Sequence, residues 1–359
     1  MELTRSGPCD EALASALVET AGGALQSFAV LAERQPGRYG DKPFLTWYDD
    51  ARDQRVELSF KTFDNWVAKV ANLLVDEFDA GPGVRVAVAL AGHWQTAVVL
   101  AACWRAGAGV VAVDPDAGAA ELAAAFGGGG VVAAFVGEEG AAKAAAAPGM
   151  PPVVAVTADL FGRGGHDLGA ARNFARVVPA MGDHFPAAAD PEGEALRIAP
   201  APRAPEAAAD PGAAAGDPGA AGDPGAGGQG ATMPQLLREA ARVAGRVGLG
   251  DGDRLLSGLA LLTPTGAAVG LLAPFGSGAG VVLDATFEAA RFWKRVADER
   301  VTVAALSPAQ AGSVLAAGPP PEDLDRSRLR AVTCPAEPVD QALQRAVRDR
   351  LGVPLLPDG

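Results

Sequence analysis

The feature that most constrains the fold is an arrangement of strand, helix and strand that occurs twice, at 84–113 and at 254–284. In the first stretch, a valine-rich run at 84–90 is followed by a helical segment at 95–106 and a second apolar run at 110–113. A unit of this kind predicts two parallel strands joined by a right-handed crossover. The chain is therefore expected to be an α/β protein whose mostly parallel sheets are flanked by helices.

The second stretch repeats the plan of the first with the same residue types at corresponding places. Arg85 and Arg254 open the first strand of each stretch, and Asp114 and Asp284 follow the second strand. Repetition at a fixed spacing predicts two similar lobes, each built on the same unit. Two unrelated units with similar turn chemistry are the alternative that the sequence alone leaves open.

Further elements follow from periodicity and capping signals. Apolar residues at spacings of three and four predict a helix over 61–78, which ends before Gly81. Thr232 and Gln235 have the spacing of a capping box, so another helix is expected to begin there. The rest of the chain is expected to alternate between helices and strands: helix 287–298, strand 301–306, helix 308–317, strand 329–333, helix 339–350 and strand 353–356.

Low complexity separates the two halves. Residues 199–230 are almost wholly alanine, proline, glycine and aspartate, with too little apolar bulk to offset the entropy of ordering. This segment is expected to be a disordered linker. The expected organisation is an N-terminal extension at 1–24, a first lobe at 25–198, the linker at 199–230 and an incomplete second lobe at 231–359.

Charge and cysteine content exclude several classes of protein. The formal net charge is -13 and the acidic residues are spread along the chain, so binding to nucleic acid or to anionic lipid is not expected. Cys9, Cys103 and Cys334 form no close pair, which argues against a disulfide framework and against a thiolate zinc site. A reducing, cytoplasmic location is consistent with this cysteine content.

Neither a secretory signal nor a membrane span is expected. The first twenty residues have no basic start and no continuous apolar core. The uncharged stretch at 255–283 contains prolines and many glycines, and it divides into strand, helix and strand.

Several short segments, taken in order, resemble one known family. The segments are Gly83-Val84-Arg85-Val86-Ala87, Ala106-Gly107-Ala108-Gly109, Asp114-Pro115, Gly252-Asp253-Arg254 and Glu299-Arg300-Val301-Thr302. Their order resembles the large N-terminal domain of the acyl-adenylate-forming family, the AMP-dependent synthetases and ligases. The resemblance covers about 25–359 and implies two lobes with a cleft between them. The family's small C-terminal lysine domain and its aromatic-Gly-x-Thr-Glu motif have no counterpart in this sequence.

The family's phosphate-binding loop is also missing. Such enzymes need a Ser/Thr/Gly-rich loop with a lysine to hold the phosphates of ATP and Mg²⁺. The resemblance places this loop after Ile198, where the chain instead continues Ala199-Pro200-Ala201-Pro202-Arg203. A catalytically degenerate relative is therefore expected, with no catalytic or metal-binding residue assigned. ATP, AMP and Mg²⁺ are expected ligands only if the ancestral site survives.

Ligand-binding candidates are the polar residues at the carboxyl ends of strands, where open α/β sheets bind ligands. Thr263 and Thr265 follow one such strand, and the resemblance places Thr263 at the wall of the acyl pocket. Ser307 follows the next strand, although it is also suited to cap the helix that begins at Pro308. His93 stands at a strand-to-helix turn, where it could contact an anion or cap the helix.

A last group of candidates stands where the family's Gly-Gly-Ala-Pro adenine loop is expected. This chain reads Cys334-Pro335-Ala336-Glu337-Pro338 there. Ala336 is compatible with the loop, whereas Glu337 would place an anion near a polyphosphate. Cys334 is equally well explained as a small buried hydrophobic residue.

Three hypotheses of function follow from these observations. The first is a degenerate relative that binds an acyl or nucleotide ligand in the cleft between the lobes. The second is an active ligase that converts a carboxylate and ATP to an acyl-AMP, completed by further residues or by a partner chain. The third is a non-catalytic scaffold, for which the sequence identifies no protein partner.

Overall fold

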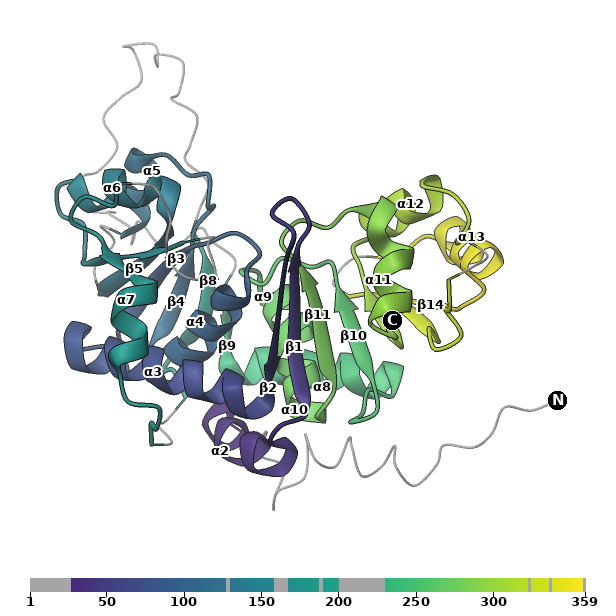
Figure 1. Ribbon diagram of the computed structural model, residues 1–359, viewed down its shortest axis with the longest axis horizontal. Coiled ribbons are helices and arrows are strands. Elements are labelled where there is room, and N and C mark those ends of the chain that lie inside the picture. The colour runs from purple at the N-terminus through teal and green to yellow at the C-terminus, as the bar shows by residue number, and fades with distance from the viewer. Residues whose placement is uncertain are drawn as a thin grey trace, which may run out of the picture.

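The computed structural model describes residues 27–126, 130–157, 167–186, 190–199, 230–321, 324–335 and 338–357. The expected extension at 1–24 lies outside the described residues, and so does the expected linker except for its first and last residues. The candidates Ala336 and Glu337 also lie outside them. The described part of the chain forms two seven-stranded sheets, which lie side by side in Figure 1.

The first sheet has the strand order β7-β6-β5-β3-β4-β8-β9. All its neighbouring strands pair in parallel except β8 and β9, which are antiparallel. Its strands are β3 (Arg85–Ala89), β4 (Gly109–Ala112), β5 (Val131–Gly137), β6 (Val153–Val156), β7 (Arg172–Asn173), β8 (Glu194–Ile198) and β9 (Gly230–Thr232). The central strands are short runs of valine and alanine, as expected of strands that are buried on both faces.

Helices cover both faces of this sheet. On one face α3 (Phe60–Phe78) and α4 (Trp94–Arg105) pack on Val86, Val88 and Val110. The strand residues that alternate with these valines point to the other face. There α5 (Ala119–Phe126) and α6 (Glu138–Ala146) pack on them. The short α7 (Phe174–Val177) and the 3-10 helix Val178–Ala180 follow β7.

The second sheet has the strand order β14-β13-β12-β10-β11-β1-β2, and its neighbours are parallel except the hairpin of β1 and β2. Its strands are β1 (Pro43–Asp49), β2 (Gln54–Ser59), β10 (Arg254–Ser257), β11 (Gly280–Asp284), β12 (Val303–Ala305), β13 (Ala331–Cys334) and β14 (Leu355–Pro357). The helices that accompany it are α8 (Met233–Val247), α9 (Pro264–Ala267), the π-helix Ala268–Leu272, α10 (Ala273–Ser277), the 3-10 helix Ala289–Arg291, α11 (Phe292–Asp298), α12 (Pro308–Ala316) and α13 (Gln341–Leu351).

The prediction of two similar lobes with mostly parallel sheets is confirmed. In each sheet the repeated unit places its arginine opposite a glycine, with Arg85 paired to Gly109 and Arg254 paired to Gly280. A third strand then lies on the far side of the first, β5 beside β3 and β12 beside β10. The two βαβ units therefore share a topology as well as a turn chemistry.

The two sheets do not follow the expected division at 199–230. β1 and β2, which lie in the first part of the chain, belong to the second sheet, because β1 pairs in parallel with β11. The position of β1 beside β11 in the second sheet corresponds to the position of β8 beside β4 in the first sheet. Conversely, β9 begins at Gly230 and pairs with the first sheet. Each sheet is thus completed by strands from the other part of the chain.

An aromatic cluster joins the two halves into one core. Phe275 in α10 has its ring centroid 5.2 Å from that of Phe44 in β1 and 5.7 Å from that of Phe60 in α3. Phe63 in α3 and Phe28 in α2 (Phe28–Tyr39) lie 5.9 and 6.2 Å from the same ring. Aromatic pairs at these separations stabilise a core beyond the area that they bury. None of the helices in the described residues is long and apolar enough to cross a membrane.

Helix α3, the longest helix of the first lobe, has well-defined ends. Ser59 caps its N-terminus by accepting a hydrogen bond of 3.1 Å from the backbone N–H of Thr62. Asp79 ends it in the left-handed conformation, with φ of 53°. This conformation favours glycine, because a Cβ atom crowds the following carbonyl.

Replacing Asp79 with glycine is expected to raise the free energy of unfolding by about 1 kcal/mol, because glycine adopts a positive φ without that crowding. Urea denaturation of the two proteins measures the difference. Asp79→Ser is the control, since serine also removes the negative charge at the helix end but keeps the Cβ atom. Equal stabilisation by glycine and serine would show that charge, and not backbone conformation, sets the cost.

Candidate functional site

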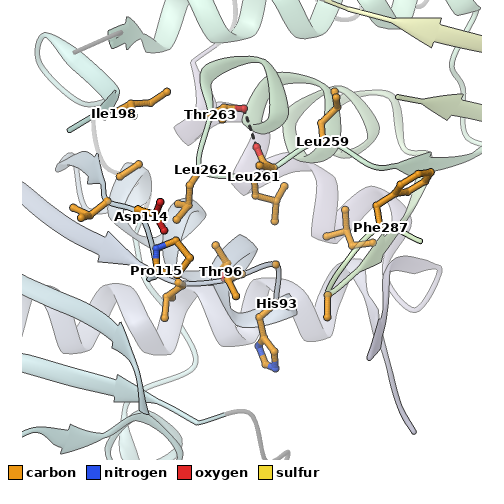
Figure 2. Close-up of a pocket in the computed structure, with 18 of the residues that line it drawn as sticks. His93, Thr96, Asp114, Pro115, Ile198, Leu259, Leu261, Leu262, Thr263 and Phe287 are labelled. Carbon is orange, nitrogen blue, oxygen red and sulfur yellow. Dashed lines mark hydrogen bonds between the residues drawn. The ribbon is translucent and has the colours of Figure 1, made fainter. Parts of the chain in front are cut away.

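A pocket of about 770 Å³ lies where the carboxyl ends of strands from both sheets meet (Figure 2). The residues after β3, β4 and β8 line it from the first sheet, and those after β10 and β11 line it from the second. Ligands of open α/β sheets bind outside the carboxyl ends of the strands, and pockets of this volume hold small organic molecules. This pocket is therefore the candidate site.

The turn after β3 forms the contact between the sheets at one side of the pocket. A Cβ atom on Gly92 would lie 2.8 Å from the carbonyl oxygen of Ala285 and 3.1 Å from that of Asp284. The indole Nε1 of Trp47 donates a hydrogen bond of 3.1 Å to the carbonyl oxygen of Gly92. Only glycine lets the turn approach β11 this closely, so Gly92 sets the separation of the two pocket walls.

His93 caps helix α4, which is one of the two roles predicted for it. Its Nδ1 accepts a hydrogen bond of 3.1 Å from the backbone N–H of Gln95, and its ring lies 4.3 Å from the ring of Trp47. Figure 2 shows the ring turned away from Leu261 and Leu262. Burial lowers the pKa of His93 to about 4, so the imidazole is neutral near pH 7 and Nε2 carries the proton. Nε2 has no hydrogen-bond partner among the described residues.

A tight loop after β10 forms the opposite wall. Thr263 lines the pocket, but its hydroxyl donates to the carbonyl oxygen of Ala260 at 2.8 Å and accepts from the N–H of Gly266 at 3.0 Å. The hydroxyl is thus used within the loop, where it caps α9. Leu259, Leu261 and Leu262 of the same loop give the wall its apolar character (Figure 2). Thr265 is half-buried in α9 and does not line the pocket.

Ser307 and Cys334 lie outside the lining of the pocket. Ser307 forms a capping box with Gln310, so the capping role that its sequence context suggested is confirmed. Gln310 itself reaches the pocket and donates a hydrogen bond of 2.6 Å from Nε2 to the carbonyl oxygen of Gly258. Cys334 is buried in the core at the end of β13, in agreement with its interpretation as a small buried hydrophobic residue. Ligand-binding roles for Thr263, Thr265, Ser307 and Cys334 stay predictions.

The charges around the pocket are negative. Its described lining residues include Asp114, Glu121 and Asp284 and contain neither lysine nor arginine. Burial raises the pKa of Asp284, and the guanidinium of Arg295, 2.8 Å from its carboxylate, opposes that shift. A triphosphate placed here would meet carboxylates with no opposing cation from these residues. In the described residues no three carboxylate, imidazole or thiol side chains gather where they could hold a metal ion.

Sequence reasoning found part of this site and missed the rest. It placed Thr263 at the carboxyl end of a strand, which is where the pocket lies. The notable departure is at the first strand of the second stretch, for which 254–261 is the apolar run in the sequence: β10 ends at Ser257, and the leucines that follow belong to the loop. Phe287 was assigned to a helix, but it precedes the 3-10 helix and lines the pocket. An apolar run after a strand is the signal that could have indicated a pocket wall.

Gly92→Ala is expected to lower the free energy of unfolding by about 1–3 kcal/mol, because its methyl group has no room against the carbonyl oxygens of β11. Gly81→Ala is the matched control, since a Cβ atom at Gly81 meets nothing within 4 Å. Urea denaturation compares both variants with the parent protein. Equal stability of the two variants would contradict close contact between the sheets at Gly92.

Stability is expected to fall with pH below about 6.5 because of His93. Between the unperturbed pKa of 6.5 and the folded pKa of about 4, the unfolded chain binds a proton at this residue that the folded chain does not. The free energy of unfolding should therefore be about 2 kcal/mol lower at pH 5 than at pH 7 from this residue alone. His93→Asn keeps a capping side chain without a titrating group. The variant should lose less stability over this interval than the parent, and identical losses would exclude the effect.

Comparisons with known proteins agree with this fold. The family described as AMP-binding enzyme matches residues 32–191 and 232–357. A Mycobacterium tuberculosis (strain ATCC 25618 / H37Rv) protein described as a TIGR03089 family protein is 33% identical over 260 residues, which cover 72% of this chain and 90% of that protein.

Two solved structures share the fold. The Brucella canis acyl-CoA synthetase superposes with a TM-score of 0.75 at 21% identity over 96% of this chain. The anthranilate CoA ligase AuaEII, in complex with anthranoyl-AMP, superposes with a TM-score of 0.68 at 17% identity over 92% of this chain. The chain spans 59% of the length of each of these two proteins. The match over both parts of the sequence confirms the predicted resemblance, and the chain belongs to the AMP-binding enzyme family.

Proposed function

We propose that this chain binds an apolar acyl group in the pocket between its two sheets and does not form acyl adenylates by itself. The observation that carries the proposal is the chemistry of the pocket, whose described lining combines leucine, alanine and phenylalanine side chains with carboxylates and has no lysine or arginine. Apolar walls favour burial of an acyl group. The carboxylates disfavour a polyphosphate in the same space.

The sequence after β8 supports the absence of adenylation. Attack on the α-phosphate of ATP needs fixed positive charge and ordered donors around the phosphates. Between Ile198 and Thr232 the sequence contains no serine, threonine or lysine, and its prolines remove backbone donors. The residues that would hold the phosphates are therefore of the wrong type at the place where the family carries them.

The acyl class of the ligand is supported by the comparison with solved structures. The anthranilate CoA ligase of the same fold is in complex with anthranoyl-AMP, which carries an aromatic acyl group. The loop of Leu259, Leu261 and Leu262 supplies an apolar surface on which such a group, or an aliphatic chain, can pack. Asp114 and Glu121 at the other wall favour a ligand whose head group is uncharged over a free carboxylate.

Ligand-induced thermal stabilisation and pyrophosphate exchange test the proposal together. Octanamide and benzamide are expected to raise Tm by more than octanoate and benzoate do, because a neutral head group avoids repulsion from the pocket carboxylates. ATP-pyrophosphate exchange should stay at background with every acid. Carboxylate-dependent exchange would support the active ligase instead, and the absence of both exchange and stabilisation would support the scaffold.

A substitution in the pocket wall tests where the ligand binds. Leu262→Asp is expected to weaken octanamide binding about tenfold or more, because it places a charge in the apolar wall of the pocket. Val30→Asp is the matched control, since Val30 is 39% exposed on α2 and does not line the pocket. Equal affinities for the two variants would place the ligand elsewhere.

A further inference from the structure

A second pocket, of about 460 Å³, lies at the opposite edge of the second sheet. It is lined by residues at the amino ends of strands, including Pro43 at the start of β1, Arg254 at the start of β10 and Gly280 at the start of β11. The acyl pocket lies at the carboxyl ends of two of these strands, β10 and β11. The two pockets are therefore separated by the length of the sheet.

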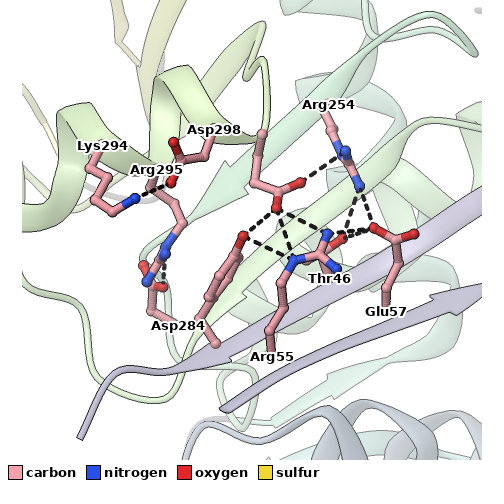
Figure 3. A network of polar contacts seen from close by, with 10 residues as sticks. Thr46, Arg55, Glu57, Arg254, Asp284, Lys294, Arg295 and Asp298 are labelled. Atoms are coloured by element: carbon pink, nitrogen blue, oxygen red, sulfur yellow. Dashed lines mark hydrogen bonds and ion pairs between the residues drawn. The ribbon is translucent and has the colours of Figure 1, made fainter. Parts of the chain in front are cut away.

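The second pocket is lined by charged side chains of both signs. They are four cations and four carboxylates: Lys42, Arg254, Arg300, Arg328, Asp251, Asp253, Asp298 and Glu299. Most of them are already neutralised inside the protein. In Figure 3, Arg254 contacts Thr46 and Glu57, and Lys294 contacts Asp298.

Two further carboxylates of the pocket, Glu299 and Asp253, have cationic partners. Glu299 lies 2.9 Å from Arg254 and 3.1 Å from Arg55, and Asp253 lies 3.0 Å from Arg330. Lys42 donates hydrogen bonds to the backbone carbonyl oxygens of Asp251 and Gly278, and the carboxylate of Asp251 forms no ion pair with the described residues. Two cations of the pocket, Arg300 and Arg328, are then left.

Arg300 and Arg328 have no acceptor within the described residues. Neither guanidinium forms an ion pair or a hydrogen bond with any of them. Both lie near Asp325, whose pKa is lowered by hydrogen bonds from Ser327 and, more weakly, by the charges of the two arginines. The carboxylate of Asp325 is bonded to the backbone N–H and hydroxyl of Ser327, at 3.0 and 2.7 Å. Two guanidiniums that form no ion pair with the described residues thus line the second pocket.

The backbone at Arg300 adds a second observation. This residue follows α11 with φ of 50°, in the left-handed conformation that favours glycine at the end of a helix. The N–H of Val301 bonds to the carbonyl oxygen of Val296 at 3.0 Å, which fixes this conformation. The arginine therefore stands at the pocket at some cost in backbone stability.

Neutralising the negative end of a helix is the ordinary role for arginines at such a place. Arg330 has this role, because its guanidinium contacts the carbonyl oxygens of Val247 and Gly248 at the end of α8. Arg300 and Arg328 bond to no carbonyl oxygen of the described residues. Their donors remain available to a ligand.

We propose that Arg300 and Arg328 form a second binding site, for the oxyanion of a small molecule, at the amino edge of the second sheet. Each guanidinium presents paired N–H donors that match the oxygens of a phosphate or a carboxylate. The volume of the pocket leaves room for the organic part of such a molecule beside the anion. This site is independent of the acyl pocket and of what that pocket binds.

Inorganic phosphate is the probe. At pH 7.5 and constant ionic strength, replacing chloride with phosphate at millimolar concentration is expected to raise Tm of the full chain by a few degrees and to saturate. Arg300→Gly should raise Tm without phosphate by about 2 °C, because glycine relieves the backbone conformation, and should abolish most of the phosphate-dependent increase. Arg328→Ser should reduce that increase as well. Succinate in place of phosphate separates a carboxylate site from a phosphate site.

Arg350→Ser is the matched control, since Arg350 is another exposed arginine at the end of a helix, α13, and does not line the pocket. It should keep the whole increase of the parent protein. The proposal is overturned if the Arg300 and Arg328 variants respond to phosphate as the parent does. It is also overturned if chloride at equal ionic strength gives the same increase, or if neither anion raises Tm.

Discussion

The packing of Phe275 against aromatic rings from the first part of the chain is the interaction on which the rest of the structure depends. Its ring meets those of Phe44, Phe60, Phe63 and Phe28, which come from β1, α3 and α2. Separation of the two sheets would expose this cluster to water, at a cost of several kcal/mol. The sheets are therefore held at one separation, and the pocket between their carboxyl ends has fixed walls.

The hairpin of β1 and β2 carries this constraint from the core to the pocket. Arg295 lies 3.5 Å from the ring of Tyr48 and contacts Asp50 and Asp284, so charged groups of α11 and β11 hold the hairpin in place. The preceding residue of β1, Trp47, donates a hydrogen bond to the turn after β3. Buried charges of this kind set the arrangement of elements more than they add net stability. Here they fix the register between β1 and β11.

Local signals predicted the elements whose neighbours are close in sequence and failed where the partner is distant. The βαβ units were predictable because valine runs and glycine turns specify them, and the caps at His93 and Ser307 because they depend on a few adjacent residues. The hairpin at 43–59 was not predicted, since its place in the second sheet is decided by pairing with β11. For the same reason one wall of the pocket could be predicted from the sequence, whereas the contact at Gly92, which requires both sheets, could not.

The residues that hold the fold together are separate from those that adenylation requires. The aromatic cluster, the helix caps and the ion pairs of the hairpin lie in the sheets and helices, whereas the resemblance places phosphate binding in the loop after β8. On the proposed function, a sequence without serine, threonine and lysine after β8 costs little stability and leaves the apolar pocket in place. The proposed function therefore requires no change of fold, because the free energy of folding and the electrostatics of the reaction reside in different residues.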